Sequence, residues 1–188
     1  MSREDVKRCA EVLPLRERLI FKLATFGGMR PGEIPALKWK HLSDESAKIE
    51  QRVYRGEIDT PKTRTSRRAI ALSGGIREDI AAWRTFALDD GPEAWVFPSE
   101  RNTPLSRDNV WRRFMQPKFA EAGLGWATFQ VMRRTHSTLM NELKVDPKLV
   151  ADQLGRTLDV NQNVYTLPSL ARRQEAVNML ETAIQNAS

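Results

Sequence analysis

The spacing of apolar residues changes twice along the chain, and this change constrains the fold more than any other feature of the sequence. Apolar residues repeat at helical intervals in residues 15–26 and again after residue 73, whereas residues 47–72 alternate between apolar and polar positions. Helical periodicity therefore surrounds one short β region. We expect a mainly α (α+β) domain with a small antiparallel sheet of two or three strands near residues 47–72.

Turn and capping residues indicate where the expected helices begin and end. Pro31 favours a short helix over Pro31–Lys38, and Thr128 opens the most amphipathic segment of the chain. Gly155 is suited to a helix C-terminus, and the last helix is expected over about 169–186. Because no internal repeat or long linker divides the sequence, we expect residues 1–188 to form a single domain.

Composition excludes several classes of protein. Of 188 residues, 40% are hydrophobic and 29% charged, which favours a folded chain with a sizeable core. No stretch approaches the roughly 18 apolar residues that a membrane span needs, and the N-terminus is charged, so we expect a cytoplasmic protein. The one cysteine, Cys9, and two histidines, His41 and His136, do not make a disulfide or a Cys/His metal cluster, so no metal or cofactor is expected.

Positive charge is concentrated in two regions. The net charge is +6, residues 62–68 (KTRTSRR) hold four basic residues and no acid, and residues 101–134 hold seven basic residues against two acidic ones. This distribution favours a polyanionic partner, although solvated basic faces also occur on proteins that bind no nucleic acid.

Two tyrosines raise the question of covalent phosphate chemistry. Displacement at a phosphodiester without a metal requires fixed cations, preferably arginines, together with a nucleophile and a proton donor for the leaving alkoxide. Tyr54 and Tyr165 are the phenols available for such a nucleophile.

Five motifs occur in an order and at spacings that span nearly the whole chain. They are Gly28-Met29-Arg30-Pro31-Gly32-Glu33-Ile34, Thr60-Pro61-Lys62-Thr63, Gln130-Val131-Met132-Arg133, Leu154-Gly155-Arg156, and Tyr165 nine residues after Arg156. Together they resemble the catalytic domain of tyrosine recombinases, the phage-integrase family.

The resemblance implies catalytic roles for individual residues. Arg30 and Arg133 would clamp the scissile phosphate, and Glu33 would fix Arg30. Tyr165 would attack phosphorus to form a 3′-phosphotyrosyl link, and Lys62 would protonate the departing 5′-oxygen. The implied enzyme is a site-specific DNA strand transferase, active in recombination or integration, that requires no metal or cofactor.

The resemblance also implies partners and domain content. Double-stranded DNA is the expected substrate, and copies are expected to self-associate on it through the C-terminal helix. The buried face of that helix would be formed by Val177, Leu180 and Ile184. The N-terminal core-binding domain that family members usually carry is expected to be absent.

Two positions depart from the family pattern. The usual first histidine is Gln130, which can donate a hydrogen bond but cannot shuttle a proton near neutral pH. The histidine or tryptophan of the third motif is Arg156, which keeps a donor and adds positive charge. These departures leave two alternatives open, namely a type IB topoisomerase-like nicking-closing activity and a catalytically impaired DNA-binding relic.

Five of the six catalytic candidates also have a purely structural interpretation. These are a surface ion pair of Arg30 with Glu33, a solvated basic hairpin around Lys62, a polar helix-start role for Gln130, attraction of Arg156 to a helix C-terminus, and packing of Tyr165 beside Val160 and Val164.

Overall fold

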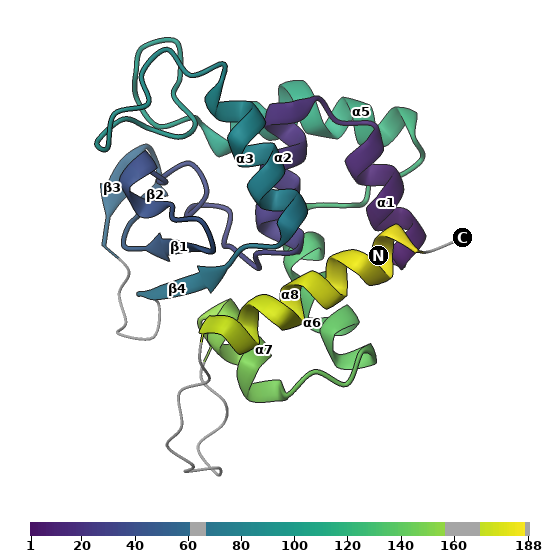
Figure 1. Ribbon diagram of the computed structural model, residues 1–188. Coiled ribbons are helices and arrows are strands. Elements are labelled where there is room, and N and C mark those ends of the chain that lie inside the picture. Colours follow the sequence, from purple (N-terminus) through teal and green to yellow (C-terminus); the bar gives the residue numbers. More distant parts are fainter. Residues whose placement is uncertain (61–66, 157–169, 187–188) are drawn as a thin grey trace.

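Helices make up most of the structure, a computed structural model that describes residues 1–60, 67–156 and 170–186. In chain order the elements are α1 (Arg3–Glu11), α2 (Leu15–Thr25), the 3₁₀-helix η1 (Trp39–His41), β1 (Ser46–Ile49), β2 (Arg52–Tyr54), β3 (Glu57–Asp59), β4 (Arg68–Ala71), α3 (Gly74–Arg84), α4 (Arg107–Val110), the π-helical segment η3 (Trp111–Met115), α5 (Gln116–Glu121), α6 (Phe129–Glu142), α7 (Pro147–Leu154) and α8 (Leu170–Gln185). The expected mainly α (α+β) fold is confirmed (Figure 1).

Side-chain caps start α6 and α7. The Thr128 hydroxyl accepts from the Val131 N–H at the start of α6, and the Asp146 carboxylate accepts from the Lys148 N–H at the start of α7. Gly155 ends α7 in the left-handed conformation, with φ of 61°. The last helix was expected to begin near residue 169, which lies outside the described residues.

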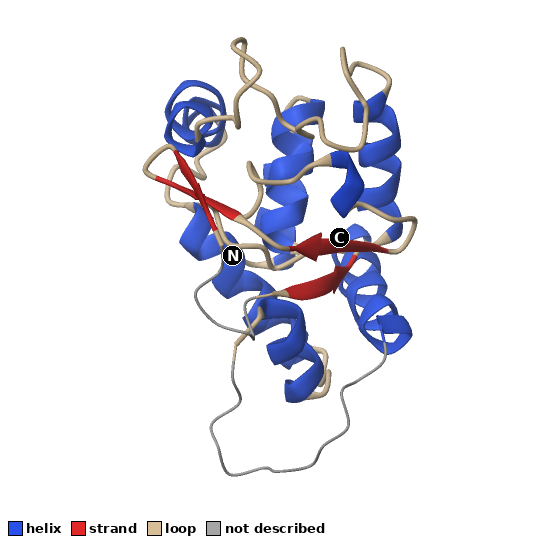
Figure 2. Cartoon of the chain, turned by 90° about the vertical axis from the view of Figure 1, so that its left-hand side faces the viewer, coloured by secondary structure: helices blue, strands red, loops and turns tan. Residues whose placement is uncertain are grey.

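Among the described residues, the strands of the β region form two separate two-stranded sheets. Strands β1 and β4 pair antiparallel, with Ser46 opposite Ala71, and β2 pairs with β3 in a hairpin (Figure 2). Arg55 and Gly56 connect β2 to β3 with φ of 53° and 83°, the positive values that a tight two-residue hairpin turn requires. The expected antiparallel β structure near residues 47–72 is confirmed, and among the described residues its four strands form two pairs instead of one sheet of two or three strands.

The expected helix over Pro31–Lys38 does not form. This segment makes successive turns, in which the Glu33 N–H donates to the Arg30 carbonyl and the Leu37 N–H donates to the Ile34 carbonyl. Pro35 interrupts helical propagation because it has no N–H and its ring clashes with the preceding turn. The prediction failed because Pro31 is suited to a helix start whereas Pro35 is not suited to a helix interior.

Helix α8 packs across the rest of the chain. It lies against β4, α1, α7 and α6, and Figure 1 shows it running from the β4 side of the molecule to α1. Val177, Leu180 and Ile184 are buried by these contacts. The apolar face expected to dock on a neighbouring copy is therefore occupied within the chain itself.

The length and polarity of the described helices are relevant to the sequence prediction about membranes. Within residues 1–60, 67–156 and 170–186, no helix combines the length and apolar character needed to cross a membrane.

Candidate active site

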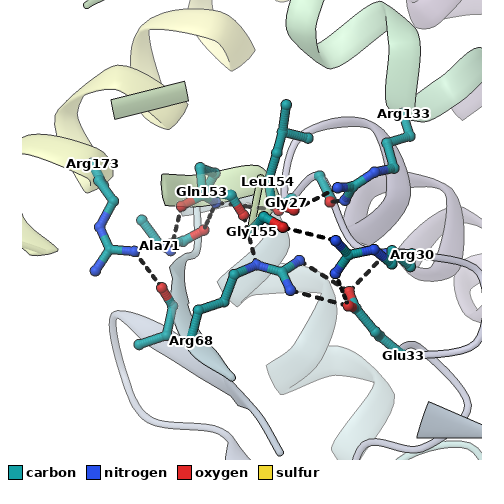
Figure 3. A network of polar contacts seen from close by, with 12 residues as sticks. Gly27, Arg30, Glu33, Arg68, Ala71, Arg133, Gln153, Leu154, Gly155 and Arg173 are labelled. Atoms are coloured by element: carbon teal, nitrogen blue, oxygen red, sulfur yellow. Dashed lines mark hydrogen bonds and ion pairs between the residues drawn. The ribbon is translucent and has the colours of Figure 1, made fainter. Parts of the chain in front are cut away.

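Three arginines from distant parts of the chain form hydrogen bonds with the C-terminus of α7. The successive carbonyls of residues 153–155 each accept from a different guanidinium (Figure 3). The pairs are Arg68 Nε with Gln153 O at 2.9 Å, Arg133 Nη2 with Leu154 O, and Arg30 Nη2 with Gly155 O at 2.7 Å. The last carbonyls of a helix lack partners within it and carry partial negative charge, so this end of α7 attracts cations.

Two glycines allow the backbone to approach these arginines. Gly155 has a φ of 61°, and a Cβ there would lie 2.9 Å from the Arg68 Cδ. Gly28 has a φ of 64°, a Cβ there would lie 2.8 Å from the Leu154 Cδ2, and its carbonyl accepts from Arg133. Both positions thus require a residue without a side chain, because of conformation and because of space.

Glu33 links two of the arginines. Its carboxylate accepts from the Arg30 backbone N–H and Nη1, both at 2.8 Å, and from Arg68 Nη1 and Nη2 at 3.0 and 2.9 Å. Burial acts to raise the pKa of Glu33, but the hydrogen bonds and charge of Arg68, with the bonds from Arg30, outweigh it and lower that pKa below its usual value. The expectation that Glu33 fixes Arg30 is met in this geometry.

Arg133 is buried on α6 and points toward the end of α7. Its guanidinium donates to the carbonyls of Gly28 and Leu154. Burial, together with the nearby charges of Arg30 and Arg68, lowers the pKa of Arg133 to about 9. An anion bound at this point would offset the repulsion among the guanidiniums.

His136 lies one turn after Arg133 and is fully buried. Its Nδ1 is 2.9 Å from the Thr25 carbonyl oxygen, and its Nε2 has no hydrogen-bond partner among the described residues. Burial lowers the pKa of His136 to about 4, so the ring is neutral near pH 7. This histidine is part of the core.

Two further sequence candidates, Arg156 and Gln130, are exposed and are not part of the three-arginine network described above. Arg156 is exposed directly after α7, where it lines a groove with residues of α6, and its charge contributes to lowering the pKa of Arg133. Gln130 is exposed on the first turn of α6. Lys62 and Tyr165 lie outside the described residues.

The sequence did not single out Arg68 or Gln153, yet both are central to the network. Gln153 is buried; its Nε2 donates to the carbonyls of Gly27 and Ala71, and its Oε1 accepts from the Ala71 N–H (Figure 3). Two sequence signals were available. Arg68 is a charged residue at the start of the apolar strand Arg68–Ala71, and Gln153 is a polar residue in the largely apolar segment before Gly155.

The arrangement is suited to binding an anion rather than a metal. Within the described ranges, no group of three or more His, Cys, Asp or Glu side chains is placed to hold a metal ion. The clustered guanidiniums instead provide hydrogen-bond donors and positive charge, which favour a phosphate and the charge that develops on it during displacement.

Comparison with known proteins assigns the family. Residues 4–171 match the model of the phage integrase family. The chain belongs to this family. Tyrosine recombinase XerA of Pyrococcus furiosus is 27% identical over 191 residues, which cover 98% of this chain and 63% of that protein. The resemblance seen in the five motifs is thereby confirmed.

Solved structures show the same fold. The crystal structure of XerA recombinase superposes with a TM-score of 0.68 at 17% identity, covering 100% of this chain and 65% of that one. The Tn1549 transposon integrase, solved in complex with circular intermediate DNA, superposes with a TM-score of 0.61 at 19% identity over 74% of this chain and 51% of that one. The chain spans between 53% and 64% of the length of the curated relatives it matches.

Proposed function

We propose that residues 1–188 form one catalytic domain of a tyrosine recombinase, which cleaves and rejoins DNA at specific sites through a 3′-phosphotyrosyl intermediate. The observation that carries the proposal is the anchoring of Arg30 and Arg133 on adjacent carbonyls at the end of α7. Membership of the phage integrase family supports the same reaction class.

Arg30 is the arginine best placed to meet a phosphate. Its side chain is 36% exposed, although Nη1 and Nη2 bind Glu33 and Gly155. A guanidinium carries five N–H donors, so these two bonds leave capacity for oxygens of a ligand. Arg133 adds a desolvated positive charge from the buried side, where it acts more strongly than in water.

The covalent step is assigned from the order of the motifs. The Tyr165 oxygen forms a bond to phosphorus, the bond from phosphorus to the 5′-oxygen breaks, and Lys62 supplies the proton to that oxygen. The phenolic proton passes to solvent, because Gln130 offers no basic atom near neutral pH. A later attack by a 5′-hydroxyl reverses the exchange and releases Tyr165.

A nicked duplex whose short 5′-hydroxyl fragment diffuses away would trap the covalent intermediate. We expect the wild-type chain to form a protein–DNA adduct on a denaturing gel and Tyr165→Phe to form none. Tyr54→Phe is the matched control, since Tyr54 is the other of the two tyrosines and lies on β2. Relaxation of supercoiled plasmid runs in parallel because that assay requires no chosen target site.

The outcomes separate the alternatives. An adduct lost in Tyr165→Phe but kept in Tyr54→Phe supports the proposal, whereas relaxation without strand exchange supports a nicking-closing enzyme. Binding to DNA without adduct or relaxation, unchanged when histidine is restored at positions 130 and 156, contradicts the proposal and supports a binding relic.

Duplex DNA is the proposed partner, and its binding should weaken with salt. The chain carries a net charge of +6, and neutralised phosphates release counterions. We expect fluorescence anisotropy to show weaker binding as salt rises from about 50 to 200 mM. Tight binding that salt leaves unchanged would contradict this mode of recognition.

We also propose self-association on DNA through α8. Since Val177, Leu180 and Ile184 are buried within the chain, α8 must leave that position before it can dock on a second copy. Sedimentation velocity should show larger assemblies with duplex than without it. Identical monomeric behaviour of the full chain and a chain ending at Thr166, both on DNA, would exclude α8 as the contact.

A further inference from the structure

We propose that Arg68 is a positioning residue, which neutralises Glu33 and thereby leaves the charge of Arg30 available for the phosphate. The inference rests on the proposed function, because it assigns Arg68 a task in that same reaction. Arg68 belongs to none of the five motifs that indicated the family.

The contacts of Arg68 show that it does not itself face a substrate. Its Nη1 and Nη2 form a fork on the Glu33 carboxylate, and its Nε donates to the Gln153 carbonyl. All three nitrogens are therefore engaged, and the side chain is only 5% exposed. Arg30, bound to the same carboxylate, is far more exposed.

The strand that carries Arg68 is held in place from several sides. Strand β4 pairs with β1, placing Arg68 opposite Ile49. Side chains of α7 and α8 also bond to the β4 region: Gln153 to Ala71, Arg173 to the Ala69 carbonyl, and Gln174 to both backbone groups of Leu72. These bonds fix the position from which Arg68 reaches Glu33.

The net charge of Glu33, Arg30 and Arg68 explains why the ion pair between Arg68 and Glu33 is needed. Glu33 is 3% exposed, and a buried carboxylate requires a compensating cation. With Arg68 present, the group of Glu33, Arg30 and Arg68 carries a net charge of +1. Without Arg68 the group is neutral, and Arg30, already bound to Glu33 through Nη1, becomes the remaining cation of the group and is drawn further onto the carboxylate. Arg30 would then lose its bond to Gly155 and its place near Arg133.

A double-mutant cycle tests whether Arg68 acts through Arg30. We expect Arg68→Met to slow adduct formation on the nicked duplex about 100-fold, the scale of a small misplacement at a reacting centre. In the Arg30→Ala background the same substitution should have no further effect. Arg18→Lys is the control: it disrupts another forked pair, with Asp79, outside the site, and should leave the adduct rate unchanged. Independent, multiplying effects of Arg68→Met and Arg30→Ala would overturn the proposal.

Arginine NMR tests the same point without DNA. A guanidinium held by several bonds rotates slowly, so we expect the Nη groups of Arg30, identified by their loss in Arg30→Ala, to give separate signals in wild type. Arg68→Met, which removes the charge, should shift and broaden these signals, whereas Arg68→Lys, which keeps the charge, should alter them less and Arg18→Lys should leave them unchanged. Unchanged Arg30 signals in a folded Arg68→Met variant would overturn the proposal. If wild type forms no adduct, the proposed function fails, while the NMR result still decides the role of Arg68.

Discussion

At the scale of single residues, the buried ring of His136 links stability to pH. The unfolded chain binds a proton at this histidine below its usual pKa of 6.5, whereas the folded chain binds one only near pH 4. Because the unfolded state takes up the proton first, stability must fall as pH drops from 6.5 toward 4. We expect a loss of between about 2 and 3 kcal/mol on going from pH 7 to pH 4.5.

Urea unfolding of wild type and His136→Gln across this pH range measures the effect. The glutamine amide can still donate to the Thr25 carbonyl but does not titrate, so most of the slope should disappear. His41→Gln is the matched control, since burial also lowers the pKa of His41 and its contribution has the same sign. Equal slopes in wild type and His136→Gln would show that the buried ring is not the titrating group.

A second residue-scale prediction concerns Gly155→Ala. The left-handed backbone costs any L-residue about 1 kcal/mol, and the new Cβ would also displace Arg68. Gly123→Ala is a matched control because Gly123 has a φ of 72° and no atom within 4 Å of an added Cβ. We expect denaturant unfolding to show a larger loss of unfolding free energy for Gly155→Ala than for Gly123→Ala. Equal losses would mean that the Arg68 side chain moves aside at no cost in stability.

At the scale of elements, Gln153 joins α7 to β4 and to the turn after α2. Gln153→Leu would leave the Ala71 N–H and the carbonyls of Ala71 and Gly27 without this partner. A buried polar group left unpaired costs about 1–3 kcal/mol, so we expect the free energy of unfolding to fall by about 3 kcal/mol.

Hydrogen exchange localises the effect of Gln153→Leu. The Ala71 amide should lose protection, whereas the exposed substitution Gln185→Leu at the end of α8 should leave it unchanged. Retained protection of Ala71 in Gln153→Leu would mean that water or another group replaces the glutamine.

At this scale the sequence predicted features that depend on local interactions, and it missed features that depend on contacts between residues far apart in the chain. Helix boundaries followed from local signals such as Thr128 and Gly155, and the motifs placed Arg30 and Arg133 at one site. Gln153 and Arg68 were missed because their partners are backbone carbonyls and a carboxylate far along the chain. No local periodicity encodes such contacts.

The β region illustrates the same limit. Alternation located the strands within residues 47–72, but it did not determine which strand pairs with which. The tight turn at Arg55 and Gly56 closes β2 on β3, and β1 is left to pair with β4 across a longer connection. The burial of the α8 face within the chain could not be predicted either, because an apolar stripe can pack against any complementary surface, in the same chain or in another.

At the scale of the whole molecule, α8 ties together segments from both ends of the chain. It packs on α1, β4, α6 and α7, and the Glu181 carboxylate accepts from the Gly75 N–H at the start of α3. Because these contacts join most of the fold, we expect α8 to unfold together with the remaining described elements in one cooperative transition.

Leu180→Ala tests this coupling. Truncation of a fully buried leucine costs about 2–5 kcal/mol, and the whole thermal transition should shift to lower temperature without splitting. Met179→Ala, at a neighbouring exposed position, should change the transition little. A split transition, with an early phase confined to α8 amides in hydrogen exchange, would instead show that α8 is released separately. That result would lower the cost of its proposed docking on a second copy, because the helix could then leave its own chain while the three-arginine site stays folded.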